Sequence, residues 1–196
     1  REILQAMNRD SAKISESDVA SWFNALACAF LLGAAAGGWL FGWLGDRIGR
    51  RPSLTASVLC YSVFTGLGYF VADPETLVAL RFLACLGVGG TWPNAVALAS
   101  EAWPDVARPT LAGLLGAAAN VGFVALGLLA CWKEVTPASW RWTLVVSAMP
   151  IALAVFCYLF VPESPRWKAS VRGKQAKANS LHEIFRGPLL WRTLLG

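Results

Sequence analysis

Five long stretches that almost lack charge constrain this chain more than any other feature. They cover residues 19–44, 53–72, 77–100, 109–132 and 142–161. The only charged side chain within them is Arg81. At a rise of about 1.5 Å per residue, roughly 20 apolar residues cross a hydrocarbon core of about 30 Å. A soluble helix would also show a polar face at helical periodicity. The sequence therefore predicts an all-α membrane protein, a helical bundle of five transmembrane spans.

The short links between these stretches predict that neighbouring spans run antiparallel, so that alternate links share a side of the membrane. Lys and Arg number 11 on the side that holds residues 45–52, 101–108 and 162–196, and 5 on the other side. The richer side is expected to be cytoplasmic. Residues 1–18 would then be extracytoplasmic and residues 162–196 a cytoplasmic basic linker. The net charge of +5 is thus explained by topology, and nucleic-acid binding is not needed to explain it.

Both ends of the sequence suggest a fragment. No initiator Met and no apolar signal precedes residues 1–18, although that segment would have to cross the membrane. Residues 187–195 read like the approach to a further span. We therefore expect a span upstream and more of the protein downstream. Between residues 172 and 186, a basic segment with spaced apolar side chains predicts a short amphipathic helix on the membrane surface, with partner docking as the alternative.

The residues that usually carry enzyme chemistry are sparse. One cysteine falls in each span, where it acts as a small apolar residue. His182 is the only histidine, so no metal-ligand spacing and no catalytic triad can be assembled. We expect no enzyme activity, no metal and no cofactor, with a coupling proton as the one candidate for a co-transported species.

A glycine-spaced motif with one acid and three bases follows the first stretch. It consists of Gly42, Leu44, Gly45, Asp46, Arg47, Gly49, Arg50, Arg51 and Pro52. The motif closely resembles the cytoplasmic signature of the major facilitator superfamily, G-x-L-[AG]-D-R-x-G-R-R, which lies between the second and third helices of that family. A generic basic loop would explain the arginines but neither Asp46 nor the three glycines.

Further segments resemble the same family in the same order. Residues 81–93 are similar to its fourth helix, and residues 100–108 to the following cytoplasmic link. Residues 162–167, Pro-Glu-Ser-Pro-Arg-Trp, resemble the signature of sugar porters and of related organic-anion and metabolite:proton transporters. The resemblance implies helices two to six of twelve, in two halves that rock about a central site. Thr91 stands where several metabolite symporters carry an acid, so a proton-coupling acid would have to lie outside the spans present.

Charged residues of these segments are expected to form a gate on the cytoplasmic face. The expected gating network is Gly42, Asp46, Arg47, Gly49, Arg50, Arg51, Glu101, Arg108, Glu163 and Arg166. Each exposed ion pair contributes only about 0 to 1 kcal/mol, but several together can bias a two-state equilibrium. The alternative is that these residues merely fix the topology of the loops.

Three residues are candidates for a substrate cavity. By helical angle Arg81 and Trp92 project to one face of their span. An arginine within a span costs at least about 2.5 kcal/mol unless it pairs, reaches water or snorkels, and Arg81 is close enough to the span's end to snorkel. Asn120 is a weaker candidate, because it lies on a seam of glycines where helix packing is the commoner role.

The resemblance implies a secondary active or facilitative transporter in the cell membrane. Its substrate would be a small polar solute, a sugar or an organic anion, moved by alternating access. Its partners would be the lipid bilayer, the missing first helix and the C-terminal half of the same protein. The alternative is a non-transporting membrane sensor or truncated scaffold of the same fold.

Overall fold

The computed structural model describes residues 16–133, 136 and 139–173 of the 196-residue chain. The chain divides into two compact units, Arg1–Ser164 and Pro165–Gly196, which are described separately. The expected extracytoplasmic segment lies almost wholly outside the described residues. So do most of the expected amphipathic helix and the start of a further span.

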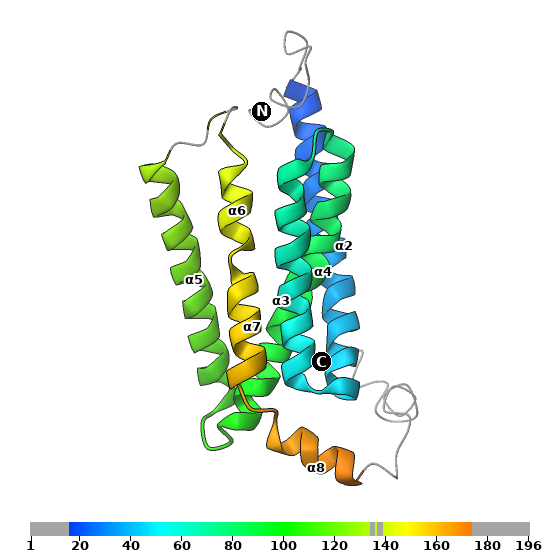
Figure 1. The fold of residues 1–196 in the computed structure, drawn as a ribbon, viewed down its shortest axis with the longest axis vertical. Helices are drawn as coiled ribbons and strands as arrows, with labels where there is room; N and C mark the ends of the chain where they lie inside the picture. The colour runs from blue at the N-terminus through cyan, green and yellow to red at the C-terminus, as the bar shows by residue number, and fades with distance from the viewer. Residues whose placement is uncertain (1–15, 134–135, 137–138, 174–196) are drawn as a thin grey trace. The chain divides into compact units, whose positions relative to one another are not determined.

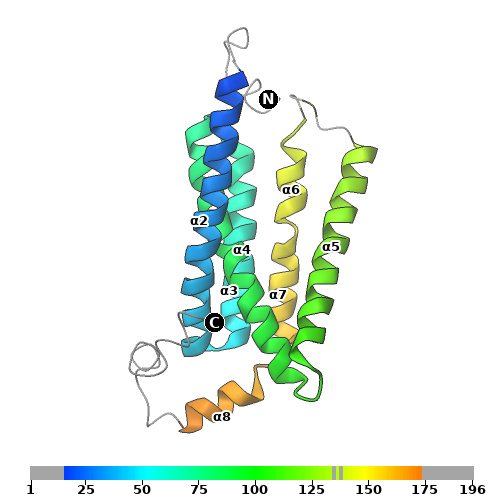
Figure 2. The same cartoon turned by 180° about the vertical axis from the view of Figure 1, so that it is seen from behind.

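The described residues are helical almost throughout and contain no strand. The first unit comprises α2 (Glu16–Ile48), α3 (Arg50–Leu67), the 3₁₀ helix η2 (Gly68–Phe70), α4 (Pro74–Ala102), α5 (Arg108–Trp132), α6 (Trp142–Ala148) and α7 (Pro150–Phe160). The second unit contains α8 (Pro165–Gly173). In Figures 1 and 2, α2, α4 and the α6–α7 pair run one way along the bundle, and α3 and α5 run the other way.

Five helical segments of the described chain are long and apolar enough to cross a membrane: Glu16–Ile48, Arg50–Phe70, Pro74–Ala102, Arg108–Trp132 and Trp142–Phe160. The predicted all-α membrane bundle of five spans is thereby confirmed. The last span is interrupted at Met149, where α6 ends and α7 begins at Pro150. Proline has no N–H to continue the ladder of α6, whereas its fixed φ suits the first position of a new helix.

The link expected between the first two spans is a single residue. Helix α2 continues to Ile48 and α3 starts at Arg50, so only Gly49 separates them. Gly49 has φ +116° and ψ 156°, a conformation that side-chain-bearing residues rarely adopt. The charged motif therefore sits on the ends of two rigid helices rather than on an extended loop.

Helix α4 forms the centre of the bundle, because it packs along both α2 and α3. Glycines bring the backbones of α2 and α4 together: a Cβ on Gly37 would overlap the backbone of Leu86, and a Cβ on Gly89 would overlap that of Ala34. Gly33 lies in the same interface, facing α4. Small residues thus allow close contact along the α2–α4 seam, as they commonly do between helices in lipid.

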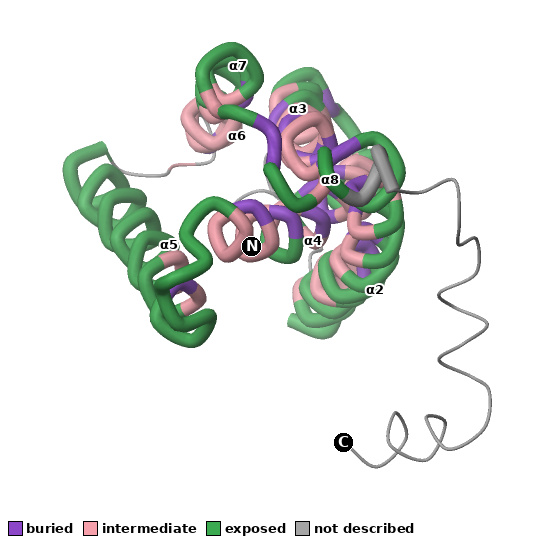
Figure 3. The backbone as a smooth tube through the Cα atoms, turned by 90° about the horizontal axis from the view of Figure 1, so that it is seen from below, coloured by how far each residue is buried: buried purple, intermediate pink, exposed green. Residues whose placement is uncertain are grey.

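Helix α5 is far less buried than its neighbours. Leu111 is its only buried residue, and Figure 3 shows it exposed along nearly its whole length. No described atom lies within 4 Å of where a Cβ of Gly113 or Gly127 would be. The glycine seam expected on this helix therefore has no packing partner at those two positions within the described part of the chain.

Candidate functional site

The carboxylate of Glu163, three residues beyond α7, caps the start of α3. Its Oε1 accepts hydrogen bonds from the backbone N–H groups of Arg50 at 3.0 Å and Arg51 at 3.2 Å, and its Oε2 lies 3.2 Å from the Arg51 nitrogen. Gly49, at the N-cap of α3, has no side chain to perform this role. A carboxylate at a helix N-terminus satisfies unpaired N–H groups and complements the helix dipole.

The side chain of Arg50 extends from the same helix end toward two other helices. Its Nη2 lies 2.8 Å from Oδ1 of Asp46 at the end of α2, and its Nε lies 3.5 Å from Oε1 of Glu101 at the end of α4. Glu101 also accepts a hydrogen bond from the Ser164 hydroxyl. The residue after Glu163 therefore binds α4 as Glu163 binds α3.

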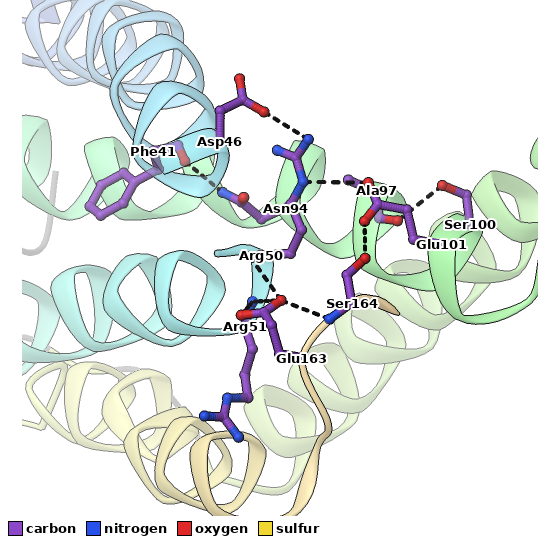
Figure 4. A network of polar contacts seen from close by, with 10 residues as sticks. All are labelled: Phe41, Asp46, Arg50, Arg51, Asn94, Ala97, Ser100, Glu101, Glu163 and Ser164. Carbon is purple, nitrogen blue, oxygen red and sulfur yellow. Dashed lines mark hydrogen bonds and ion pairs between the residues drawn. The ribbon is translucent and has the colours of Figure 1, made fainter. Parts of the chain in front are cut away.

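Figure 4 shows these contacts as one network at a single end of the bundle. The ends of α2 and α4, the start of α3 and the segment after α7 all contribute, although residues 46 and 163 are far apart in sequence. Of the ten residues expected in a gating network, the structure joins Asp46, Arg50 and Glu101 by ion pairs and adds Glu163 through the backbone of α3.

Burial separates the network into a strong part and a weak part. Glu163 is only 9% exposed, and charge-assisted hydrogen bonds of this kind contribute about 1.5–3 kcal/mol each. The side chain of Asp46 is 62% exposed, and an ion pair in that setting contributes about 0 to 1 kcal/mol. The contact of Glu163 with α3 is thus the stronger one, and the Asp46–Arg50 contact is the one that costs less to break.

The other arginines of the motif lie around this network. The guanidinium of Arg47 stacks on the Trp43 ring at 4.2 Å, and within the described chain Arg47 has no ion pair. Arg51 donates through Nη1 to the carbonyl of Val161 at 3.2 Å and lies over the Tyr158 ring.

The remaining members of the expected network add no ion pair to it among the described residues. Arg108 is exposed at the start of α5 and has no ion pair with any described residue. Arg166 belongs to α8, in the second unit. Around Gly42, no described atom lies within 4 Å of a would-be Cβ, whereas a Cβ on Gly49 would meet the Glu163 carboxylate.

A buried polar cluster lies directly beside the charged network. Asn94 of α4 and Ser53 of α3 both have 0% exposure, and both donate to the backbone carbonyl of Phe41 in α2, at 3.0 Å and 2.6 Å. One carbonyl thus receives side chains from two neighbouring helices. Buried polar groups need such partners, and here the bonds fix the relative positions of α2, α3 and α4.

Of the three candidate cavity residues, Trp92 and Asn120 both lie near Gly116, and Arg81 lines a different part of α4. Arg81 is exposed, lies 5.9 Å from the centre of the Phe30 ring and lines a shallow, open depression between α3, α4 and α6. Trp92 is 49% exposed and faces α5 near Gly116. Asn120 of α5 is exposed and donates to the carbonyl of Gly116 in its own helix at 2.9 Å.

At the opposite end of the bundle, Arg141 joins α6 to the end of η2. Its Nε and Nη2 donate to the carbonyls of Tyr69 and Val71, each at 2.9 Å. Asp73 caps α4 there by accepting from the Thr76 N–H at 2.7 Å. A hydrogen bond from the Thr76 side chain and, to a lesser extent, one from its backbone N–H hold the pKa of Asp73 below its usual value.

Several of these residues were not assigned a role from the sequence. Ser164 and Ser53 carry no distinguishing pattern, and Arg141 counts only as a loop charge until the carbonyls it meets are known. Asn94 is an amide within an apolar span, but Asn24 and Asn120 share that signal, so the sequence does not single it out. No cluster of three or more His, Cys, Asp or Glu able to hold a metal occurs among the described residues.

Comparisons with known proteins place this geometry in a family context. The profile of the sugar (and other) transporter family matches residues 2–189. The inner membrane metabolite transport protein YgcS of Escherichia coli is 33% identical over 159 residues, which are 81% of this chain and 36% of that protein. The cis,cis-muconate transport protein of Acinetobacter baylyi is 37% identical over 141 residues, which are 71% of this chain and 34% of that protein.

A solved structure shows the same fold. The xylose transporter XylE from E. coli, in an inward open conformation, superposes with a TM-score of 0.73 at 21% identity, covering 98% of this chain and 48% of that one. The chain spans about a third of the length of the curated relatives it matches and about half of this structure. These relatives are transporters rather than enzymes.

Proposed function

The chain belongs to the sugar (and other) transporter family, and we propose that it forms part of a transporter that moves small polar solutes across a membrane by alternating access. It is a multi-pass membrane protein, with five apolar helices long enough to span a bilayer. In this proposal the polar network at the Gly49 end of the bundle is the gate.

The observation that carries the proposal is the unequal strength of the contacts around Arg50. The backbone of α3 is held by the buried carboxylate of Glu163, whereas the Arg50 side chain reaches the largely exposed Asp46. A two-state element needs contacts that exchange within a few kcal/mol, and an exposed ion pair fulfils that condition. The stronger contact would keep α3 and α7 together while the weak contact opens and closes.

We propose the substrate class from the names of the proteins that this chain is similar to. Relatives carry names that refer to metabolites and to cis,cis-muconate, and the similar solved structure is a xylose transporter. Sugars and small organic anions are therefore the solutes to test. Arg81, in the open depression between α3, α4 and α6, would favour an anion if it faces the transport path.

Sidedness, location and energy coupling complete the proposal. We place the protein in the cell membrane, with the Gly49 end and residues 162–196 on the cytoplasmic side, because that side holds most of the basic residues. No Asp or Glu lies within the five apolar stretches, so a coupling proton would be carried by a part of the protein outside them.

The direct experiment is uptake of labelled solutes by a complete transporter that contains this chain, purified and reconstituted into liposomes. A panel of pentoses, hexoses and mono- and dicarboxylates is compared with and without an inward proton gradient. The proposal expects saturable uptake of at least one solute above protein-free liposomes. Uptake no greater than in protein-free liposomes for the whole panel would contradict it.

A further inference from the structure

The amide of Asn94 is fixed in one orientation inside the bundle. Its Nδ2 donates to the carbonyl of Phe41 at 3.0 Å and to that of Gly90 at 2.9 Å, and the residue has 0% exposure. Because both amide hydrogens have carbonyl partners on two helices, the side chain cannot turn over without losing both bonds. The direction of its Oδ1 is therefore set by the packing of α2 on α4.

This oxygen has no hydrogen-bond partner in the described part of the chain, although it is buried. It lies against Gly45, where an added Cβ would collide with it. The same hypothetical Cβ would lie 3.3 Å from Nη1 of Arg50. The amide oxygen and the guanidinium thus border one small space, which stays open because residue 45 has no side chain.

The guanidinium of Arg50 also has hydrogen-bonding capacity to spare within the described part of the chain. Its Nη2 pairs with Asp46, but its buried Nε has only the long 3.5 Å ion pair with Glu101 and no hydrogen bond. A guanidinium offers five N–H donors. Figure 4 shows the Asn94 amide next to the Arg50 guanidinium, with the contacts of each drawn to other groups. A buried amide oxygen without a described partner and a guanidinium with a donor to spare are therefore neighbours.

We propose that Oδ1 of Asn94 is a second acceptor for Arg50. When the Asp46–Arg50 pair opens, the guanidinium turns across Gly45 and donates to the amide oxygen. Asn94 is then a positioning residue of the gate. Its role in transport rests on the proposed function, whereas the pairing of Arg50 with Asn94 can be tested without it. The carboxylates that also face Arg50 are Asp46 and Glu101.

A neutral amide suits an exchange of this kind. It accepts a hydrogen bond from the guanidinium, whereas a carboxylate in its place would add the attraction of a full opposite charge in a buried site. Two acceptors of unlike strength, one exposed and charged and one buried and neutral, would give Arg50 two resting positions. A negative charge at residue 94 should therefore favour the position of Arg50 next to residue 94, and this effect should disappear when Arg50 is replaced.

The first test measures pairing without transport, by thermal unfolding of the complete protein in detergent. Asn94→Asp is made alone, with Arg50→Gln, and with Arg47→Gln, which removes an equal charge that stacks on Trp43 instead. Asn94→Asp also removes the amide N–H donors, but this effect on Tm is the same in both backgrounds and cancels in the comparison. The loss of Tm from Asn94→Asp should be larger by about 3 °C or more with Arg50→Gln than with Arg47→Gln. Equal losses in both backgrounds would overturn the proposal.

The second test measures the exchange itself, as the kcat and KM of uptake. Asp46→Asn should leave Arg50 resting on Asn94 and slow turnover. Adding Asn94→Ser removes the second acceptor while its hydroxyl can still bond the Gly90 carbonyl. The double variant should recover kcat at least about threefold over Asp46→Asn with little change in KM, whereas a purely structural role for Asn94 makes the double variant slower.

A double variant no faster than Asp46→Asn would overturn the exchange. If the wild type shows no uptake of any solute, the proposed function fails instead. The Tm comparison would then support or overturn the pairing of Arg50 with residue 94 by itself.

Discussion

The carboxylate of Glu163 accepts a hydrogen bond of 3.0 Å from the backbone N–H of Arg50, a residue 113 positions earlier in the chain. This bond joins the segment after the last span to the start of α3. It also orients Arg50, because the helix end that Glu163 caps is the one that carries the guanidinium. The position of Arg50 thus depends on a backbone contact as well as on its own ion pairs.

Removing that cap should weaken the bundle more than removing an ion pair. Glu163→Ala leaves the N–H groups of Arg50 and Arg51 without their acceptor in a buried site, and we expect a loss of about 2–4 kcal/mol in the free energy of unfolding. Glu163→Gln keeps one acceptor oxygen and should lose about half as much. Denaturant or thermal unfolding of the purified protein in detergent measures both.

Asp46→Asn is the matched control for stability, since it removes a carboxylate of the same network from a site that is 62% exposed. It should cost no more than about 1 kcal/mol. If Asp46→Asn destabilised the protein as much as Glu163→Ala, the division into a strong and a weak part would be wrong.

The turn between α2 and α3 should tolerate no side chain. Gly49→Ala would place a Cβ against the Glu163 carboxylate at φ +116°, and we expect about 1–3 kcal/mol of destabilisation from backbone strain alone. Gly122→Ala in α5 is the control, because no described atom lies within 4 Å of its would-be Cβ. The two variants are compared by unfolding midpoint at equal expression, and equal midpoints would contradict this account of the turn.

The fold could be predicted from the sequence because length and apolarity alone determine a membrane span. The polar network around Arg50, by contrast, depends on contacts between residues far apart in the sequence. Glu163 and the backbone N–H of Arg50 are more than a hundred residues apart in sequence, and the packing of α7 against α3 brings them together. The charged motif was recognisable, but the sequence could not show that Arg47 stacks on Trp43 while Arg50 bridges two helices.

The extent of the helices was also hidden from composition. Charged residues of the motif suggested a link of several residues, because charges are usually excluded from spans. The helices nevertheless continue through them, since at the end of a bundle those side chains reach one another or water. Asn94 was noticeable as an amide in an apolar span, but its partner is a backbone carbonyl, which no side-chain pattern reveals.

The cap of α4 by Asp73 predicts a pH dependence of stability. Hydrogen bonds from Thr76 lower the pKa of Asp73 in the folded state below its usual 3.8, so the folded state favours the ionised form. The stabilisation is complete above the unfolded pKa and is lost as the pH falls through the lower folded pKa. The Tm difference between wild type and Asp73→Ala should be constant from pH 7 to about pH 5 and shrink below about pH 4. A difference that instead changes between pH 5 and 7 would contradict this.

Arg81 predicts a dependence on substrate charge. If it faces the transport path, Arg81→Lys keeps the charge but loses the planar fork of donors, and uptake of a carboxylate should fall by tenfold or more while a neutral sugar is less affected. If it only snorkels, lysine should serve almost as well. Uptake is compared for wild type, Arg81→Lys and Arg81→Gln at matched expression. Equal uptake in all three would remove Arg81 from the substrate site.

The proposed gate is tested most directly by the initial rate of solute uptake for wild type and Asp46→Asn at equal abundance in the membrane, with Asp105→Asn as the control. Both substitutions remove a charge without changing shape, but Asp105 has no ion pair to Arg50. We expect Asp46→Asn to lower uptake at least about tenfold, while Asp105→Asn keeps it within about twofold. Wild-type uptake by Asp46→Asn would contradict the assignment of this network as the gate.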